Sequence, residues 1–240
     1  MAFKLNDISK KFRKSIKSNL KRRGWLLIPD KFSESYLRNY NFEIATLIDI
    51  GVGRGTPSLY KLYSNRRIVM IDPFPAVAER CAAWLSDPNF DIKLLNCAAG
   101  ECETELELSL RGDGSSLQQR IGREKAVTES ALVRVRRLDD LVAEHAITGP
   151  FGIKIDTEGS ELGVVRGACE TLKNTQFVIA EVSVKQRFKG GYTFSEFVSE
   201  MARNGFEVAD IVGIREHSRF FDVLFVPGDS SHLKAIYEQR

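Results

Sequence analysis

The sequence predicts an α/β protein built on a doubly wound, mostly parallel, Rossmann-like sheet. An apolar strand at 45–50 runs into a glycine-rich turn, Gly51-Val52-Gly53-Arg54-Gly55, and a second apolar strand at 67–71 ends in Asp72. Strands then alternate with helices along most of the chain, which is the pattern of parallel strands joined by crossover helices. The 240 residues suffice for one such domain and a small appendage.

The expected elements follow one another with short connections. A helix should start near Thr56 or Pro57 and reach residue 63. Two segments, 103–110 and 132–136, alternate apolar and polar residues, which predicts a small antiparallel insertion between the third and fourth core strands. The other expected elements are a helix at 76–85, a strand at 92–97, a helix at 138–145, a strand at 151–156, a helix at 162–172, a strand at 177–184, a helix at 194–204, and strands at 206–212 and 221–226. We expect the last two strands to pair as an antiparallel hairpin at the sheet edge.

The first 23 residues differ in charge from the rest of the chain. They hold nine Lys or Arg and one acid, whereas the whole chain carries a net charge of +3. Apolar residues recur at spacings of three and four, which indicates an amphipathic helix with a basic face: Leu5, Ile8, Phe12, Ile16 and Leu20. We therefore divide the chain into this helix with its connector (1–44) and a cofactor-binding domain (45–240).

The basic segment is open to two interpretations, a solvated helix packed on the domain or on a partner protein, and a peripheral contact with an anionic membrane surface. Nucleic acid is disfavoured, because the basic run lacks interleaved aromatic residues. No apolar run approaches the roughly 20 residues that span a bilayer, and no signal-peptide segment is evident. The four cysteines form no C-x-x-C pair. These features predict a cytoplasmic protein, with a possible location at the inner face of the membrane.

The two strand ends predict a nucleoside site. Asp72 follows Gly51 by 21 residues, the placement of an acid that accepts hydrogen bonds from ribose hydroxyls. The glycines have the spacing G-x-G-x-G, because Thr56 stands where a dinucleotide fingerprint has its third glycine. Asp49 would repel a pyrophosphate but suits a cationic sulfonium. We therefore favour S-adenosylmethionine over a nicotinamide dinucleotide, and a methyltransferase over a dehydrogenase.

Five polar residues are expected at the carboxyl ends of strands, where open α/β sheets bind ligands. They are Asp49, Asp72, Asn96, Asp156 and Glu181. The turn after the fourth core strand adds Glu158, whereas Glu161 fits a first-turn acid favoured by the helix dipole. Lys154 could lie at the surface or pair with Asp156 or Glu181. The isolated histidines, His145, His217 and His232, are expected at the surface.

An ordered set of motifs resembles the FkbM-type methyltransferases. It begins with Asp49-Ile50-Gly51 and Asp72-Pro73-Phe74-Pro75, and its most specific part is the run from Lys154 to Glu161, followed by Gly167-Ala168. The remaining matches are Ser115-Ser116-Leu117, Arg137-Leu138-Asp139-Asp140-Leu141, Glu181-Val182-Ser183 and Asp222-Val223-Leu224-Phe225-Val226. The resemblance covers about residues 45–227. It implies a class I methyltransferase fold, S-adenosylmethionine as cofactor, and O-methylation, often of sugar hydroxyls on glycans or glycosylated natural products.

This chain departs from many members of that family at two points. It has Val52-Gly53 where Ala-Asn is frequent, and Asp72-Pro73 where Glu-Pro is common. Both changes keep the carboxylate and the backbone freedom that a nucleoside site needs.

Together the strand ends and the resemblance predict the site residues. The cofactor would contact Asp49, Gly51, Gly53, Gly55, Thr56, Asp72, Pro73, Asn96, Ala98 and Ser116. Asp156, Glu158 and Glu181 would be catalytic, because a positioned carboxylate can orient and deprotonate an acceptor hydroxyl. Alternatively, these three acids could hold a divalent cation such as Mg²⁺. The acceptor would be a glycan or a small molecule, a non-sugar natural product being the alternative to a sugar. A non-catalytic nucleoside-binding scaffold is the alternative to an enzyme.

Overall fold

The computed structural model describes residues 10–24, 30–110, 115–119, 121, 129–214 and 220–233, which fall into two compact units, 1–30 and 31–240. In the first unit, α1 (Lys10–Arg22) is the predicted basic helix. Its Ile16 and Leu20 are half-buried, and the other side chains described from Ser15 to Arg22 are exposed. The part of the prediction that concerns residues 1–9 lies outside the described residues.

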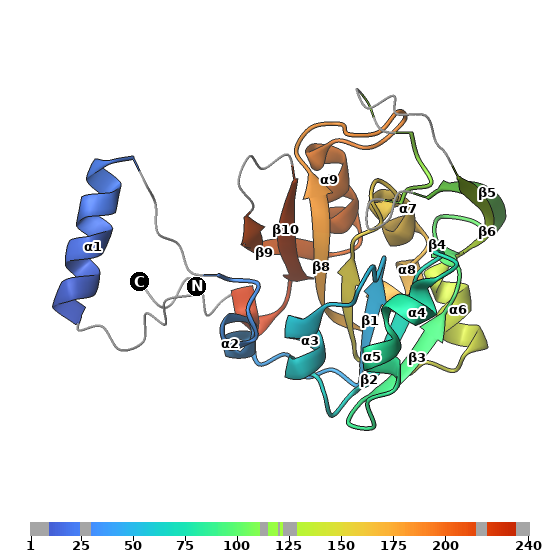
Figure 1. Ribbon diagram of the computed structural model, residues 1–240, viewed down its shortest axis with the longest axis horizontal. Coiled ribbons are helices and arrows are strands. Elements are labelled where there is room, and N and C mark those ends of the chain that lie inside the picture. The colour runs from blue at the N-terminus through green and yellow to red at the C-terminus, as the bar shows by residue number, and fades with distance from the viewer. Residues whose placement is uncertain are drawn as a thin grey trace. The chain divides into compact units, whose positions relative to one another are not determined.

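The second unit contains a seven-stranded sheet with the order β3-β2-β1-β7-β8-β10-β9 (Figure 1). Its strands are β1 (Thr46–Ile50), β2 (Arg67–Ile71), β3 (Asp91–Leu95), β7 (Phe151–Ile155), β8 (Thr175–Ser183), β9 (Phe206–Ile214) and β10 (Phe220–Pro227). The neighbours from β3 to β8 pair in parallel, and β10 is antiparallel to both β8 and β9. The predicted mostly parallel, doubly wound sheet is therefore confirmed. The predicted hairpin forms, but only β9 lies at the edge, because β10 lies between β8 and β9.

Helices cover both faces of this sheet, as a doubly wound fold requires. The elements on one face are α2 (Glu34–Leu37), the 3₁₀ turn η2 (Arg38–Tyr40), α3 (Pro57–Leu62), α4 (Val77–Arg80) and α5 (Ala82–Leu85). Those on the other face are α6 (Leu138–Glu144), α7 (Glu161–Arg166), α8 (Cys169–Leu172) and α9 (Phe194–Arg203). Apolar residues alternate between these faces along β1, where Leu47 packs on the first face and Ile48 on the second.

Two predicted helices are each divided in two. The helix expected at 76–85 breaks at Cys81 into α4 and α5. The helix expected at 162–172 breaks at Gly167-Ala168, because the chain there passes so close to Gly100 that a Cβ on Gly167 would lie 2.0 Å from the Gly100 carbonyl oxygen. The Asp139 carboxylate then accepts hydrogen bonds from the backbone N–H groups of Glu170 and Thr171, which starts α8.

The predicted insertion between the third and fourth core strands is a three-stranded sheet with the order β4-β6-β5. It consists of β4 (Ala98–Ala99), β5 (Thr104–Ser109) and β6 (Ser130–Arg136). β5 and β6 pair antiparallel, as their alternating pattern predicts, and β4 pairs with β6 in parallel.

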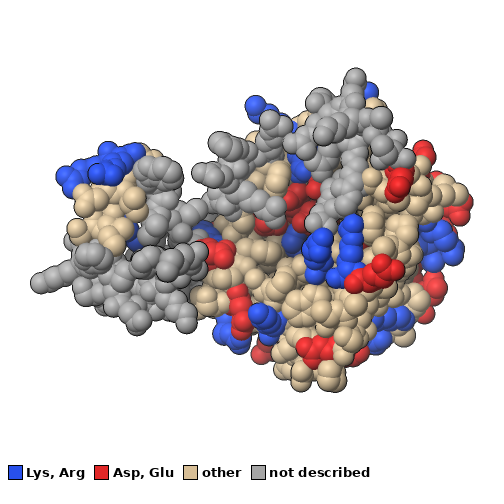
Figure 2. All heavy atoms as spheres, viewed as in Figure 1, with Lys and Arg blue, Asp and Glu red and all other residues tan. Residues whose placement is uncertain are grey.

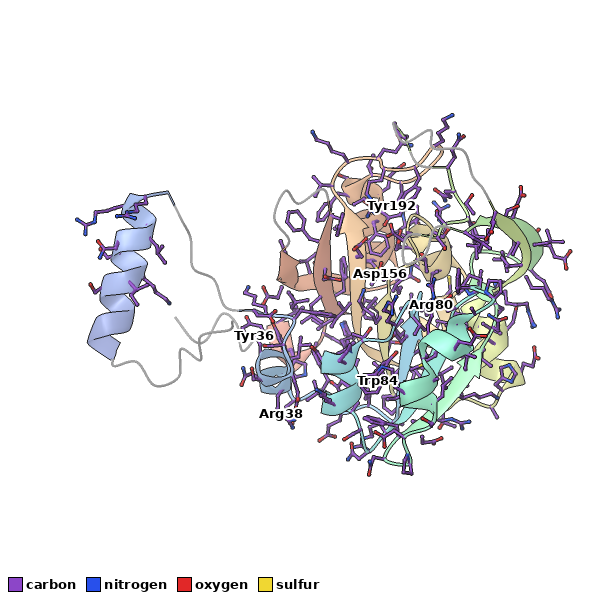
Figure 3. All side chains as sticks on the ribbon, in the orientation of Figure 1. Tyr36, Arg38, Arg80, Trp84, Asp156 and Tyr192 are labelled. Carbon is purple, nitrogen blue, oxygen red and sulfur yellow. The ribbon has the colours of Figure 1, made fainter. Side chains whose placement is uncertain are left out.

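Residues 31–44 belong to the same compact unit as the sheet, whereas the sequence-based boundary lies after residue 44. Leu37, Phe42 and Ile44 are buried in the core. Asp210 on β9 also accepts hydrogen bonds from this segment, from Lys31 Nζ at 2.5 Å and from the hydroxyl of Tyr36 at 2.9 Å (Tyr36 is labelled in Figure 3). Among the described residues, no helix has the length and apolar character needed to cross a membrane.

Candidate functional site

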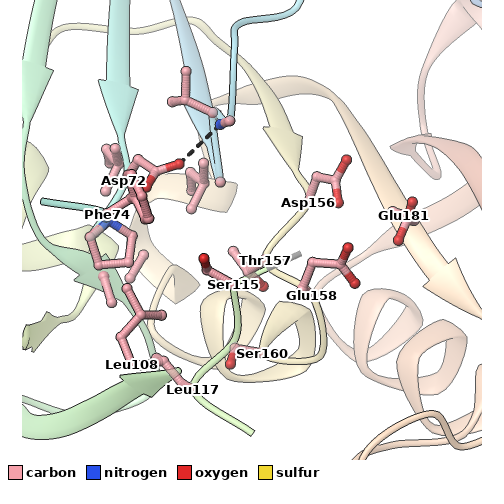
Figure 4. Close-up of a pocket in the computed structure, with 18 of the residues that line it drawn as sticks. Asp72, Phe74, Leu108, Ser115, Leu117, Asp156, Thr157, Glu158, Ser160 and Glu181 are labelled. Carbon is pink, nitrogen blue, oxygen red and sulfur yellow. Dashed lines mark hydrogen bonds between the residues drawn. The ribbon is translucent and has the colours of Figure 1, made fainter. Parts of the chain in front are cut away.

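A cavity of about 300 Å³ lies at the carboxyl ends of β1, β2 and β7 (Figure 4). The connections of β1 and β7, which are neighbours in the sheet, run in opposite directions from this point, so the cavity is at the topological switch point. We call the side formed by Gly51, Gly53 and Asp72 the glycine half, and the side formed by Asp156, Glu158 and Glu181 the acid half. Figure 4 shows Asp72 on one side of the cavity and the three acids on the other.

The glycine half depends on a close approach of backbones. Gly51 has a φ of +78°, and a Cβ at this position would lie 1.9 Å from the Asp156 carbonyl oxygen. Backbone hydrogen bonds from Gly51 N to Ile71 O (2.9 Å) and from Asp156 N to Ile50 O (2.8 Å) join the ends of β2, β1 and β7. Only glycine permits both the left-handed conformation and this contact.

Asp72 is the acid of the glycine half. It is 7% exposed, and its two carboxylate oxygens accept hydrogen bonds from Gly53 N at 3.0 Å and Phe74 N at 2.8 Å. Burial raises the pKa of Asp72, and the backbone N–H donors oppose that rise. The Asn96 side chain donates to the carbonyl oxygens of Asp72 and Phe74, so it fixes this turn from outside the cavity lining.

Asp49 precedes the glycine-rich turn 51–55 and does not line the cavity. Its side chain points toward α3, where it accepts hydrogen bonds from the hydroxyls of Thr56 (2.9 Å) and Tyr60 (2.5 Å). Burial raises the pKa of Asp49 to about 6, against the lowering effect of the Tyr60 hydrogen bond. Gly55 packs against the rings of Tyr60 and Trp84 (Figure 3). These contacts therefore hold the glycine-rich turn 51–55 in place from the side away from the cavity.

Among the three acids of the acid half, Asp156 is the most exposed to solvent, with 31% of its side chain accessible. The ammonium group of Lys154, itself buried, lies 3.4 Å from Asp156 Oδ2 and 3.3 Å from Asp222 Oδ1. Burial alone would lower the pKa of Lys154, but the surrounding carboxylates, Asp156 first, hold it above its ordinary value. The sequence left open whether Lys154 is exposed or paired, and the structure shows it buried and paired with Asp156.

Glu158 and Glu181 share a different cation. The Arg187 guanidinium contacts Glu158 Oε2 at 2.6 Å and Glu181 Oε1 at 2.9 Å. Burial and the nearby Asp156 carboxylate raise the pKa of Glu181 above its ordinary value, and the hydrogen bond from Arg187 opposes that rise. Among the residues that the structure describes, no group of three or more His, Cys, Asp or Glu is arranged to hold a metal ion. The predicted alternative of a divalent cation held by Asp156, Glu158 and Glu181 is therefore not supported.

Glu161, predicted as an ordinary first-turn acid, has a larger structural role. It is buried, and its carboxylate accepts hydrogen bonds from the N–H groups of Thr157 and Gly159 and from the Tyr192 hydroxyl at 2.6 Å (Figure 3). These bonds fix the turn that carries Asp156 and Glu158. Glu158 has a left-handed backbone conformation, with a φ of +53°. The only signal for this role in the sequence is the position of Glu161 five residues after Asp156.

The predicted site residues thus divide into two groups. Those that line the cavity are Gly51, Gly53, Asp72, Pro73, Ala98, Asp156, Glu158 and Glu181. Those that support the lining from outside are Asp49, Gly55, Thr56, Asn96 and Ser116, whose hydroxyl donates to the Glu158 carbonyl oxygen. The sequence analysis missed Arg187 and three residues that line the cavity, Arg54, Phe74 and Arg80. The guanidinium carbon of Arg80 lies 3.6 Å from the centre of the Phe74 ring.

The histidines lie away from this site or outside the described residues. His145 ends α6, and the His232 ring packs against Phe42 with centroids 4.5 Å apart. The prediction for His217 lies outside the described residues.

One comparison with a solved structure agrees with this architecture. A methyltransferase FkbM from Methylobacillus flagellatus KT is similar in fold, with a TM-score of 0.54 and 18% identity over 83% of this chain. The match covers 48% of that protein, so this chain spans about half of its length. Magnesium protoporphyrin IX methyltransferase from Synechocystis PCC 6803, solved with bound S-adenosylmethionine, gives a TM-score of 0.46 and 10% identity over 95% of this chain and 86% of that one. No curated protein matches the sequence.

The family comparison is more specific than the structural one. The sequence profile of the methyltransferase FkbM domain matches residues 49–208. This range contains both halves of the cavity, from Gly51 to Glu181, and it covers more than half of the chain. The chain therefore belongs to the FkbM family of methyltransferases.

Proposed function

We propose that this protein is an S-adenosylmethionine-dependent O-methyltransferase that acts on a hydroxyl group of a sugar, in a glycan or a glycosylated metabolite. One observation carries the proposal. A single cavity at the switch point combines a ribose-type acid, Asp72, with a second, partly open acid, Asp156, on the opposite side. The first suits the nucleoside part of a cofactor and the second suits proton removal from an acceptor.

The glycine half fits the nucleoside. A cavity of about 300 Å³ is within the range typical of small-molecule sites. The two oxygens of Asp72 accept the backbone N–H groups of Gly53 and Phe74, and the Val52 N–H also stabilises the charged form. A carboxylate offers about four lone-pair positions, so capacity remains for a hydrogen bond from the ribose. Gly51 and Gly53 would let the cofactor lie against the backbone. When bound, S-adenosylmethionine supplies an electrophilic methyl group.

The acid half fits an alcohol acceptor. Asp156 would accept the proton of the acceptor hydroxyl while the oxygen takes up the methyl group, a role that contributes about 10²–10⁴-fold to a rate. Glu181 is a weaker candidate for the base, because its side chain is only 5% exposed and is already paired with Arg187. Glu158 and Glu181 would orient the acceptor through hydrogen bonds. A sugar offers several hydroxyls to such a polar wall.

Two alternatives remain to be separated from this function. The acceptor could be a non-sugar natural product, or the chain could bind the nucleoside without catalysis. A transfer assay with methyl-labelled S-adenosylmethionine and separate pools of glycans, nucleotide sugars and aglycone metabolites separates them. We expect label in a carbohydrate fraction. Label only in aglycone metabolites would contradict the sugar assignment, and cofactor binding without any transfer would support the scaffold.

We also propose that α1 contacts an anionic membrane surface on the cytoplasmic side. α1 has seven basic residues and no acid, and Figure 2 shows Lys and Arg side chains clustered at one end of this unit. Clustered basic residues are attracted to anionic lipids by about 1 kcal/mol each. We expect the full chain to float with phosphatidylglycerol vesicles and not with phosphatidylcholine vesicles, and Lys17→Glu with Lys21→Glu to weaken this binding by at least about thirtyfold. Lys61→Glu with Lys173→Glu is the matched control, and equal losses in the two double variants would contradict a role for α1.

A further inference from the structure

The acid half of the cavity contains its own cations. The Asp156 carboxylate is partnered by Lys154, and the Glu158 and Glu181 carboxylates are partnered by Arg187. Arg187 follows β8 in the chain and lies 29 residues from Glu158. The two nitrogens of its fork contact one carboxylate each, so the guanidinium bridges two different elements of the site. A planar, permanently charged group with fixed donors is suited to this task.

The position of Arg187 is fixed from several sides. Its side chain is 13% exposed, and its guanidinium carbon lies 4.4 Å from the centre of the Phe220 ring on β10. Its backbone carbonyl oxygen accepts a hydrogen bond from Ile121 N at 2.8 Å, and Lys189 N donates to Gln119 O at 2.8 Å. The segment after β8 is thus tied to the segment after β5. These contacts hold the guanidinium between the two glutamates.

Arg187 is held in its protonated, positively charged form. Burial alone would lower its pKa, but Glu158 and Glu181 hold that pKa above the ordinary value. Without the guanidinium, Glu158 and Glu181 would lose a cation that both of them contact, whereas Asp156 would keep Lys154 at 3.4 Å. Carboxylates that share a partly buried site repel one another, and carboxylate oxygens are ligands that suit a divalent cation.

We propose that Arg187 is a positioning residue that acts as the resident cation of the acid half, occupying the place a divalent ion would take between Glu158 and Glu181. The methyl-acceptor wall of the cavity is then complete without metal, and Asp156 stays available as the base. The inference rests on the proposed function only for the role of Asp156. The placement of the cation is independent of the acceptor and of the cofactor.

The test is a gain of metal binding. Mn²⁺ is titrated into the full chain and followed by electron paramagnetic resonance, which requires neither acceptor nor cofactor. We expect wild type and Arg187→Lys to bind Mn²⁺ weakly, and Arg187→Met to bind it at least about tenfold more tightly, because the substitution removes the positive charge that both glutamates contact. Adding Glu158→Gln to Arg187→Met should abolish that gain. Arg203→Met, which removes an exposed arginine from Glu200, is the matched control.

Two results would overturn the inference. One is an Arg187→Met protein that is folded by circular dichroism and gains no Mn²⁺ affinity. The other is a wild type that already binds Mn²⁺ at a site lost in Glu158→Gln, a measurement that holds even if Arg187→Met does not fold. Calorimetry with S-adenosylmethionine on wild type with and without a chelator is run in parallel. Absence of cofactor binding in both would contradict the proposed function and leave the metal result intact.

Discussion

The two halves of the cavity are built in different ways. The glycine half is shaped by backbone atoms: Gly51 touches the Asp156 carbonyl, and backbone N–H groups fix the Asp72 carboxylate. The acid half is shaped by side-chain ion pairs between residues far apart in the sequence, such as Glu158 with Arg187. The first half therefore depends on steric fit and the second on charge balance. Substitutions should reveal this difference in their size and in the property they change.

The largest effect is expected for Gly51→Ala. A left-handed φ costs an L-residue about 1–2 kcal/mol, and the new Cβ would overlap the Asp156 carbonyl oxygen at 1.9 Å. We expect a loss of at least about 4 kcal/mol in the free energy of unfolding, measured by denaturant titration. Gly53→Ala is the control, because its φ is also positive at +57° but no atom lies within 4 Å of the added Cβ. Equal losses would show that strain and not contact determines the glycine half.

Lys154→Met should destabilise the protein by about 3–5 kcal/mol, because it leaves the buried Asp222 carboxylate and Asp156 without their shared cation. The same denaturant titration measures this effect. Lys173→Met, at an exposed pair with Glu170, is expected to leave the free energy of unfolding unchanged within experimental error. A loss at Lys154 as small as that at Lys173 would mean that charge balance contributes little to the acid half.

Asp156→Asn should lower the rate of methyl transfer about 10²-fold, because the side chain keeps its shape but cannot accept the proton. The measurement is a steady-state assay with an acceptor found in the labelled-donor screen. Glu170→Gln serves as the control for removal of a surface acid. A wild-type rate in Asp156→Asn would assign the base to another group.

Asp72→Ala should weaken S-adenosylmethionine binding by about 1–3 kcal/mol, because the ribose hydroxyls lose their acceptor. Isothermal titration calorimetry gives the change in Kd directly. Asp229→Ala, at an exposed turn, is the control. Unchanged affinity in Asp72→Ala would remove this residue from the nucleoside site.

The same contrast explains what could be predicted from the sequence. Gly51 and Asp72 could be assigned because their roles depend on local spacing and on strand ends, which the apolar pattern locates well. The order of β1, β7, β8 and β10 could not be derived from that pattern, and this order brings Lys154 and Asp222 together. The pairing of Arg187 with Glu158 and Glu181 was missed for the same reason, since long-range ion pairs leave no local signature.

Asp49 shows a further limit. Its distance from Gly51 suggested a residue that faces the ligand, but side chains alternate along β1, so Asp49 points toward Tyr60 on α3. The helix break at Gly167 likewise depends on a contact with Gly100, 67 residues earlier, that no helical periodicity contains. Tertiary contacts determine both features.

A crystal structure of the protein with S-adenosylhomocysteine tests the central claim, the division of one cavity between nucleoside and acceptor, most directly. We predict that a ribose hydroxyl lies within hydrogen-bond distance, about 2.5–3.0 Å, of the Asp72 carboxylate, and that the sulfur points toward Asp156. A ribose bound away from Asp72, or a sulfur directed away from the acid half, would contradict the account.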